Sequence, residues 1–190
     1  MPMSPVTHFF IGWLTANTSR IERRERMLVT VAGIAPDADG LVVLGDFLAG
    51  QSTQQLELWS RYHHILGHNI GFAVLLTALA ALLARKRKIL VAALAGISFH
   101  LHLLGDLLGS RGPDGHQWPM PYLLPFSNAW QWVWEGQWVL NSWQNLLITV
   151  SVLGTSFYLA WKRGYSPLEM ISVKADQGFI AALRKRFGKP

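Results

Sequence analysis

The stretch that decides the fold is FHLHLLGDLLGS, which runs from Phe99 to Ser110. Its apolar residues suit a helix that is buried in lipid or in a protein core. The same stretch contains His100, His102 and Asp106, and ionisable side chains are costly to bury in either environment. Because such residues inside a membrane segment usually mark a functional site, we expect this helix to carry one.

The composition predicts an all-α, multi-pass helical membrane protein. Hydrophobic residues make up 51% of the chain, the mean hydropathy is +0.23, and only 15% of residues are charged, whereas a soluble domain has about 25% charged residues. Three stretches approach the roughly 20 apolar residues that cross a bilayer: Ile65–Ala84, Ile89–Leu108 and Trp143–Trp161.

Shorter elements complete the predicted architecture. Two short N-terminal helices are expected, over Thr7–Asn17 and from RIERRER to near Ala35, where Pro36 follows. The span that ends at Ala84 is expected to start near Gln55 and to run through HHILGHN as one helix. We assign residues 1–165 to a membrane-embedded helical domain and 166–190 to a basic amphipathic tail lying on the membrane surface.

The basic residues indicate a membrane rather than a nucleic acid. The net charge is +6, but lysines and arginines form short clusters at the ends of apolar segments: Arg20–Arg26, Arg85–Lys88, Lys162–Arg163 and Arg184–Lys189. This distribution is typical of the cytoplasmic face of a membrane, next to anionic lipid headgroups. We therefore expect an inner-membrane protein with cytoplasmic basic loops and tail, in contact with membrane lipids and not with nucleic acid. The N-terminus has no basic region or small-residue cleavage site, so no removable signal peptide is expected.

The histidines and most aspartates are predicted to collect at the opposite end of the helices. At 1.5 Å per residue, His8 lies about 18 Å from Arg20, and His68 about 25 Å from Arg85. His102 and Asp106 lie about 21 and 27 Å from Lys88 by the same measure. These distances come from separate segments and agree, so they predict one polar site near the extracytoplasmic face.

Helical spacing selects the groups that can act together. His102 and Asp106 are four residues apart and project from one side of a helix. His64 and His68 share that spacing, while His63 is five residues from His68 and can still reach the same point if the helix starts or bends there. His100 points about 160° away from His102, so we expect it to be a structural neighbour of the site and not a ligand of the same ion.

Four motifs occur in the order and spacing of a known family. THFFIGWL, GIAPDADGL, HHILGHN and HLLGDLLGSRG…LLPFS, between residues 7 and 128, resemble the YdjM-like membrane-bound metal-dependent hydrolases. That family is thought to be distantly related to zinc-dependent phospholipase C and P1-type nucleases, which are helical enzymes that cut phosphodiesters. The resemblance implies the metal ligands His8, Asp37, Asp39, His63, His68, His102 and Asp106.

One motif departs from the family pattern. The family usually has His-Arg-Gly followed by Thr-His-Ser, and this chain has His64 in place of the arginine, Gly67 in place of the threonine and Asn69 in place of the serine. If the arginine contacts a phosphate, His64 replaces it only in part. We assign catalytic roles to His64, as this contact, and to Asp39. Asp37, Asp39 or Asp106 can bridge two ions, or one of them can act as general base.

The expected chemistry is phosphoester hydrolysis. The chain has no cysteine, so nitrogen and oxygen must hold any metal, which suits zinc and also manganese. Seven candidate ligands exceed the needs of one ion and suit two, although the number of ions, one to two or more, stays open. Paired ions can activate water and stabilise both the attacking and the leaving oxygen in phosphoester hydrolysis. A lipid or lipid-linked phosphoester is the substrate expected near a membrane interface; its identity and the oligomeric state stay open.

Other readings of the same residues remain. A metal-ion or proton transporter also places histidine and aspartate within helices, although it needs a polar path to the other face. A non-catalytic membrane adaptor would use the basic tail to bind a partner or lipid. Asp37 and Asp39 can be a structural pair that forms a loop and caps a helix. The three histidines of HHILGHN can form a proton-sensitive switch, and His116 can be an additional ligand.

Overall fold

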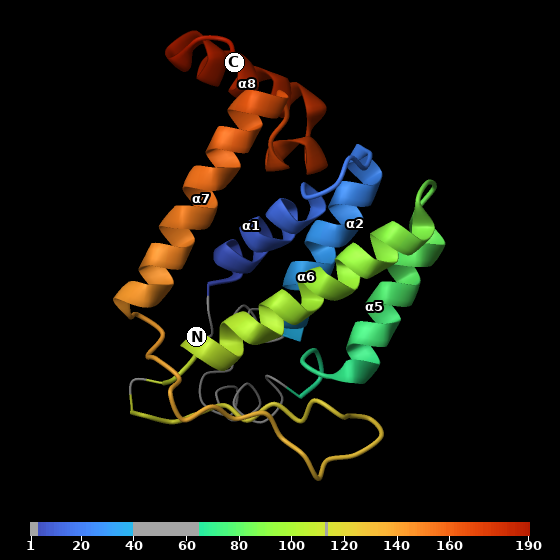
Figure 1. The fold of residues 1–190 in the computed structure, drawn as a ribbon, viewed down its shortest axis with the longest axis vertical. Coiled ribbons are helices and arrows are strands. Elements are labelled where there is room, and N and C mark those ends of the chain that lie inside the picture. The colour runs from blue at the N-terminus through green and yellow to red at the C-terminus, as the bar shows by residue number, and fades with distance from the viewer. Residues whose placement is uncertain (1–3, 40–64, 113) are drawn as a thin grey trace, which may run out of the picture.

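A computed structural model describes residues 4–39, 65–112 and 114–190 of the chain. This part of the chain is helical and contains two isolated β-bridges but no strand. Figure 1 shows helices running along the molecule, with the last one, α8, lying across one end. In chain order the elements are α1 (Pro5–Ala16), α2 (Arg23–Ile34), the 3₁₀ helix η1 (Ala35–Asp39), α5 (Ile70–Leu83), α6 (Lys88–Gly109), α7 (Trp143–Arg163), the 3₁₀ helix η2 (Pro167–Met170) and α8 (Val173–Phe187).

Helix α6 is at the centre of the packing. It lies against α1, α2 and α5, while α7 contacts α1 and α8 contacts both α7 and η2 (Figure 1). Glycine and serine allow α1, α2 and α6 to approach closely. A Cβ added at Gly12 would lie 2.9 Å from the Thr30 carbonyl oxygen, and one added at Gly33 would lie 2.5 Å from Ser98 Oγ. These small residues decide how closely the elements that carry the site can approach one another.

The N-terminal helices confirm the sequence prediction. Ser4 accepts a hydrogen bond from the Val6 amide and Pro5 opens α1, which is the usual chemistry of a helix start. Helix α2 ends at Ile34, one residue before the predicted end. The chain then continues as η1, since Pro36 is compatible with the first turn of a helix.

Helix α5 is shorter than predicted. Residues 65–69 form a turn and not a helix, so the predicted span Ile65–Ala84 is wrong at its N-terminal end. The Asn69 side chain accepts a hydrogen bond from the Phe72 amide at 2.9 Å and donates to the Ile65 carbonyl at 2.8 Å. Asparagine is a strong N-cap, so it starts the helix at Ile70. The resulting 14 residues extend about 21 Å, less than the roughly 30 Å of a hydrocarbon core.

Among the described residues, α6 alone is both long and apolar enough to cross a membrane. The predicted three-span, multi-pass arrangement is therefore not confirmed. Helix α7 has 21 residues but includes several polar ones, namely Gln144, Asn145, Thr149, Ser151, Thr155 and Ser156. Large apolar side chains are nevertheless exposed along α5 and α7: Val74, Leu75, Leu79, Leu82, Leu83, Leu146, Leu147, Val150 and Phe157.

The predicted collection of basic clusters at one end of the bundle is confirmed. Arg24 donates to the Leu83 carbonyl, Arg87 donates to the Arg20 carbonyl, and Arg163 donates to Asn17. These bonds join the start of α2, the α5–α6 turn and the end of α7 at the end of the molecule where α8 also lies (Figure 1). An apolar cluster of alanines, valine and leucine, including Ala16, Val29, Ala80, Val91 and Leu94, fills the interior next to this end.

The division at residue 165 stays a prediction. The segment after it is attached to the bundle, because Glu169 of η2 accepts two hydrogen bonds of 2.7 Å from the guanidinium of Arg26. Asp176 of α8 accepts hydrogen bonds from both the amide and the hydroxyl of Ser166. The tail is thus a folded helical segment with one buried ion pair to the bundle, Arg26–Glu169, and one buried contact within itself, Ser166–Asp176.

Candidate metal centre

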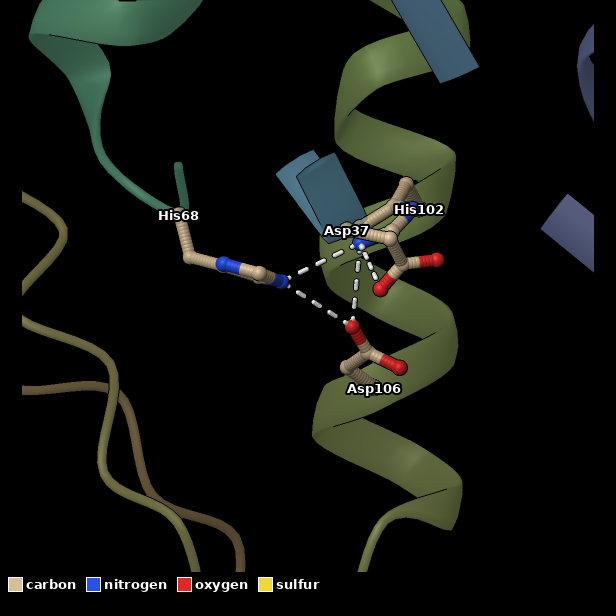
Figure 2. A group of neighbouring side chains, drawn as sticks. All are labelled: Asp37, His68, His102 and Asp106. Atoms are coloured by element: carbon tan, nitrogen blue, oxygen red, sulfur yellow. Dashed lines mark hydrogen bonds and ion pairs between the residues drawn. The ribbon is translucent and has the colours of Figure 1, made fainter. Parts of the chain in front are cut away.

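Four side chains from three segments meet at the end of α6 opposite the basic clusters. Asp37 comes from η1, His68 from the turn before α5, and His102 and Asp106 from α6 (Figure 2). One nitrogen or oxygen from each lies within 4.8 Å of the others. His68, His102 and Asp106 are buried and Asp37 is partly buried. This group, called here the four-residue centre, has the donor set of a zinc or manganese site.

Four distances within the four-residue centre are close to those expected around a single ion. His102 Nε2 lies 3.1 Å from His68 Nε2, 3.1 Å from Asp106 Oδ2 and 3.7 Å from Asp37 Oδ1. His68 Nε2 lies 3.3 Å from Asp106 Oδ2. Tetrahedral ligands at about 2.1 Å from a zinc ion are separated by about 3.4 Å. The measured separations lie on both sides of that value.

The protonation of His102 also favours a cation at this point. His102 Nδ1 lies 2.9 Å from the Gly33 carbonyl oxygen, which can only accept, so Nδ1 carries the proton. In a neutral ring, Nε2 then presents a lone pair to the carboxylate oxygens of Asp37 and Asp106, which also have only lone pairs. Lone pairs that converge repel each other unless a proton or a metal ion lies between them. A hydrogen bond from the outer nitrogen to a carbonyl is also the usual support of a metal-binding histidine.

Gly67 explains how His68 reaches Asp37. A Cβ at Gly67 would lie 2.5 Å from the Pro36 carbonyl oxygen and 2.9 Å from its Cα. The turn before α5 therefore packs against η1 at a distance that only glycine permits. Gly67 thus has a structural role in this chain: it lets the two segments approach one another.

His8 lies beside the four-residue centre on the other oxygen of Asp106. Its Nε2 is 3.2 Å from Asp106 Oδ1, and its ring centroid is 3.8 Å from that of His102. Asp106 therefore presents Oδ1 to His8 and Oδ2 to His68 and His102. If a metal ion is bound at the centre, such a carboxylate could be oriented toward it by His8 or could also serve a second ion.

The position of α6 is fixed by hydrogen bonds between side-chain amides and backbone carbonyls. Sequence reasoning missed these groups. The buried side chain of Gln137 donates to the Asp106 carbonyl at 2.9 Å and to Ser110 Oγ at 3.0 Å, and Asn145 donates to the Gly109 carbonyl at 2.8 Å. These bonds satisfy carbonyls that the end of a helix leaves without partners. No sequence pattern identifies Gln137 or the Gly33 carbonyl, because each acts through a contact between distant segments.

The remaining candidates are placed elsewhere or are not described. His63 and His64 lie outside the described residues, and Asp39 ends η1 with its side chain outside them as well. His100 is directed away from the centre, as expected: its Nδ1 donates to the Gly96 carbonyl and its Nε2 accepts from the Tyr122 hydroxyl. His116 is exposed on the long loop and is not part of the four-residue centre.

Comparison with known proteins gives one match. The profile of a family described as YdjM inner membrane protein matches residues 3–181. No curated protein and no solved structure matches the chain. The suggested relationship to phospholipase C and P1-type nucleases therefore stays a prediction.

Proposed function

The chain belongs to the YdjM inner membrane protein family, and from this premise we propose that it is a membrane-bound metal-dependent hydrolase acting on a phosphoester of a lipid or lipid-linked molecule. Membership itself indicates an inner-membrane location. The observation that carries the proposal is the convergence of Asp37, His68, His102 and Asp106, from three segments, with their ligand atoms within 4.8 Å. Such a cluster inside a membrane protein is expensive to bury and is usually functional.

The proposal gives each group a role. Asp37, His68, His102 and Asp106 hold a divalent ion, zinc or manganese, and His8 either orients Asp106 or contributes to a second ion. A divalent ion there would polarise a phosphoryl oxygen and make water more acidic. Asp39 and His64 are proposed as the general base and the phosphate contact, and His63 as a further ligand.

The substrate class follows from the position of the centre. The four-residue centre lies at the end of α6 opposite the basic clusters, and positive residues favour the cytoplasmic face. The proposed orientation therefore puts the centre near the extracytoplasmic interface, where lipid headgroups carry phosphoesters. Exposed apolar side chains along α5 and α7, such as Leu82 and Leu146, support direct contact with the surrounding lipid.

The interior of the bundle favours a pocket over a transport path. A transporter needs polar groups that continue from the centre toward the basic end. The described residues between them instead include an apolar cluster with Val29, Ala80, Val91, Leu94 and Ala95. This core supports a site that opens toward one side of the membrane.

Metal content of the purified full-length protein tests the proposal. Elemental analysis of protein in detergent is expected to find at least one zinc or manganese ion per chain. Asp106→Asn and His102→Ala should lower metal affinity by about tenfold or more, because each removes a ligand or its charge. His116→Ala is the matched control, since His116 is exposed on the loop, and it should keep the ion. Absence of metal, or full occupancy in the two variants, would contradict the proposal.

Activity separates the hydrolase from an adaptor that holds a structural ion. Phosphate or alcohol release from bis(p-nitrophenyl) phosphate and from phospholipid vesicles should require the bound metal. A chelator should abolish release and added metal should restore it. Asp106→Asn should lower the rate by about tenfold or more. A protein that binds metal but releases nothing from any phosphoester would contradict the enzymatic part of the proposal.

A further inference from the structure

An apolar cavity lies between α1, α7, η2 and α8, apart from the four-residue centre. Its volume is about 300 Å³, at the lower end of the range of ligand pockets, about 300–1,000 Å³. The lining includes Phe9, Phe10, Phe157, Ala160, Leu168 and Phe179. Phe9 and Phe10 follow His8, and since each residue turns a helix by about 100° they project from other sides of α1 than His8 does. The cavity and the centre are therefore separate sites.

One polar group on the cavity wall lacks a partner. Ser156 of α7 lines the cavity, is 1% exposed, and its hydroxyl makes no hydrogen bond with any described residue. Buried hydroxyl groups are normally hydrogen-bonded, and leaving one without a partner destabilises the protein. Ser166 also lines the cavity, but its hydroxyl already donates to Asp176, so Ser156 is the donor that the described wall leaves available. A ligand that is mostly hydrocarbon and carries an acceptor, such as an ester carbonyl, matches this wall.

The charges around the cavity select among such ligands. Lys162 and Arg163 lie two and three residues after Ala160, in the last turn of α7, and Arg184, Lys185 and Arg186 occupy the last turn of α8. Arg184 reaches α7, where it donates to the Trp161 carbonyl. The acidic groups nearby are already engaged: Glu169 pairs with Arg26 and Asp176 accepts from Ser166. The surplus positive charge attracts an anionic headgroup.

We propose that this cavity binds an acyl chain of an anionic phospholipid. The hydrocarbon chain lies among the phenylalanines of α1, α7 and α8, an ester carbonyl accepts a hydrogen bond from Ser156, and the phosphate lies at the basic end of the bundle. The bound lipid joins α7 and α8 to α1. This site is independent of the hydrolase proposal, because α1 separates it from the four-residue centre.

Native mass spectrometry of the full chain in detergent tests this site with three lipids. Dioleoyl phosphatidylglycerol has the required chain and charge, dioleoyl phosphatidylcholine has the same chains without net charge, and dihexanoyl phosphatidylglycerol has the charge without long chains. We expect only the first to remain bound at stoichiometric levels. Equal retention of the neutral lipid or of the short-chain lipid would overturn the proposal.

Two variants on α7 link the binding to the cavity. Ser156→Leu fills the cavity and removes the donor, so lipid affinity should fall by about tenfold. Gly154→Leu is the matched control, because a Cβ at Gly154 meets nothing within 4 Å, and it should bind lipid as the wild type does. If Ser156→Leu does not fold, Leu168→Trp fills the cavity from η2 and should give the same loss. Wild-type lipid affinity in the folded cavity-filling variant would overturn the proposal.

Metal content distinguishes this result from the proposed enzyme. Ser156→Leu should keep the metal of the wild type, since the substitution is on the far side of α1. Loss of lipid with retained metal supports the cavity as a separate lipid site. Loss of both together would show that the two sites are coupled and would overturn their independence.

Discussion

At the scale of single residues, the carbonyl oxygen of Gly33 decides which nitrogen of His102 is available to the centre. The 2.9 Å hydrogen bond from Nδ1 leaves Nε2 directed at His68, Asp106 and Asp37. Gly33 can take this position because it has no side chain of its own, so that α2 packs directly against Ser98 of α6. The chemistry of His102 is thus set by a residue that has no reactive group.

Gly33→Ala should therefore weaken metal binding without changing any ligand. The added Cβ would lie 2.5 Å from Ser98 Oγ, which can rotate, and 3.2 Å from Gly12 Cα, which cannot. We therefore expect the backbone of Gly33, with its carbonyl, to shift relative to His102. We expect metal affinity, measured by competition with a chromophoric chelator, to fall by about 10- to 100-fold.

Ser98→Ala provides the control for this prediction. It removes the hydroxyl that the new methyl group would meet, so the double variant Gly33→Ala/Ser98→Ala should recover part of the affinity. Ser98→Ala alone should bind metal as the wild type does. Unchanged affinity in the single Gly33→Ala variant would mean that this carbonyl does not position His102.

The residue-scale predictions succeeded where two groups share one helix. The spacing of His102 and Asp106 predicted their common direction, and the opposite direction of His100 followed from the same rule. The spacing of His64 and His68 could not be used in this way, because Asn69 starts the helix only after them. The contribution of His68 depends instead on Gly67 packing against Pro36.

At the scale of elements, the C-terminal end of α6 determines where Asp106 lies. Gln137, from the long loop, donates to the carbonyls of Asp106 and Leu107 and to Ser110 Oγ. Gln137→Ala leaves these buried acceptors without that donor, which costs about 1–3 kcal/mol of unfolding free energy. We expect lower thermal stability and weaker metal binding together.

Gln131→Ala is the matched control, because Gln131 belongs to the same loop and is exposed. It should change neither the melting temperature nor the metal affinity. A Gln137→Ala variant that lost stability but kept full metal affinity would limit Gln137 to a structural role.

Glu25 connects the start of α2 to the turn between α5 and α6, and it makes this connection sensitive to pH. Burial by itself would raise the pKa of Glu25, but hydrogen bonds from backbone N–H groups, including those of Arg85 and Lys86, outweigh it and lower the pKa from its usual value of 4.5. A lowered pKa in the folded state means that the ionised carboxylate stabilises the protein at neutral pH. This contribution is lost as the pH falls through the folded-state pKa.

The expected result is a difference between the wild type and Glu25→Gln that depends on pH. At about pH 6 the variant should melt at a lower temperature, and the two proteins should converge as the pH falls to about 3. Melting curves of both proteins across this range measure the difference in melting temperature. Taking this difference removes the contribution of the other titrating groups, which the two proteins share. A constant difference at all pH values would contradict this role of Glu25.

At the scale of the whole molecule, one buried ion pair connects the C-terminal segment to the bundle. Arg26 of α2 donates twice to Glu169 of η2, and its guanidinium carbon lies 3.9 Å from the centre of the Tyr165 ring. Glu169→Gln leaves the arginine charge buried without its partner, which costs about 3–5 kcal/mol. We expect a lower melting temperature and faster proteolysis of the segment after residue 165.

Glu22→Gln is the control, because Glu22 also pairs with a basic residue, Lys86, but both side chains are exposed. Solvent screens such a pair, so the variant should melt and resist proteolysis almost as the wild type does. Equal effects of the two substitutions would show that the buried pair does not connect the tail to the bundle.

The sequence by itself determined the helices and the two ends of the molecule. Apolar runs, breakers and caps act on neighbouring residues, and the rise of a helix is the same everywhere, so the separation of basic clusters from His8, His68, His102 and Asp106 could be calculated along each segment. The start of α5 was missed, although Asn69 is a recognisable cap, because the apolar pattern before it was read as one long helix.

The tertiary structure decided how the separated groups meet at one site. The meeting of Asp37 with His68 depends on the close approach at Gly67, the direction of His102 depends on the Gly33 carbonyl, and the position of Asp106 depends on Gln137. Each is a contact between segments distant in the chain. Helical periodicity gives the height and direction of a side chain on its own helix, but the rotation and distance of one helix against another come from packing, which no local pattern encodes.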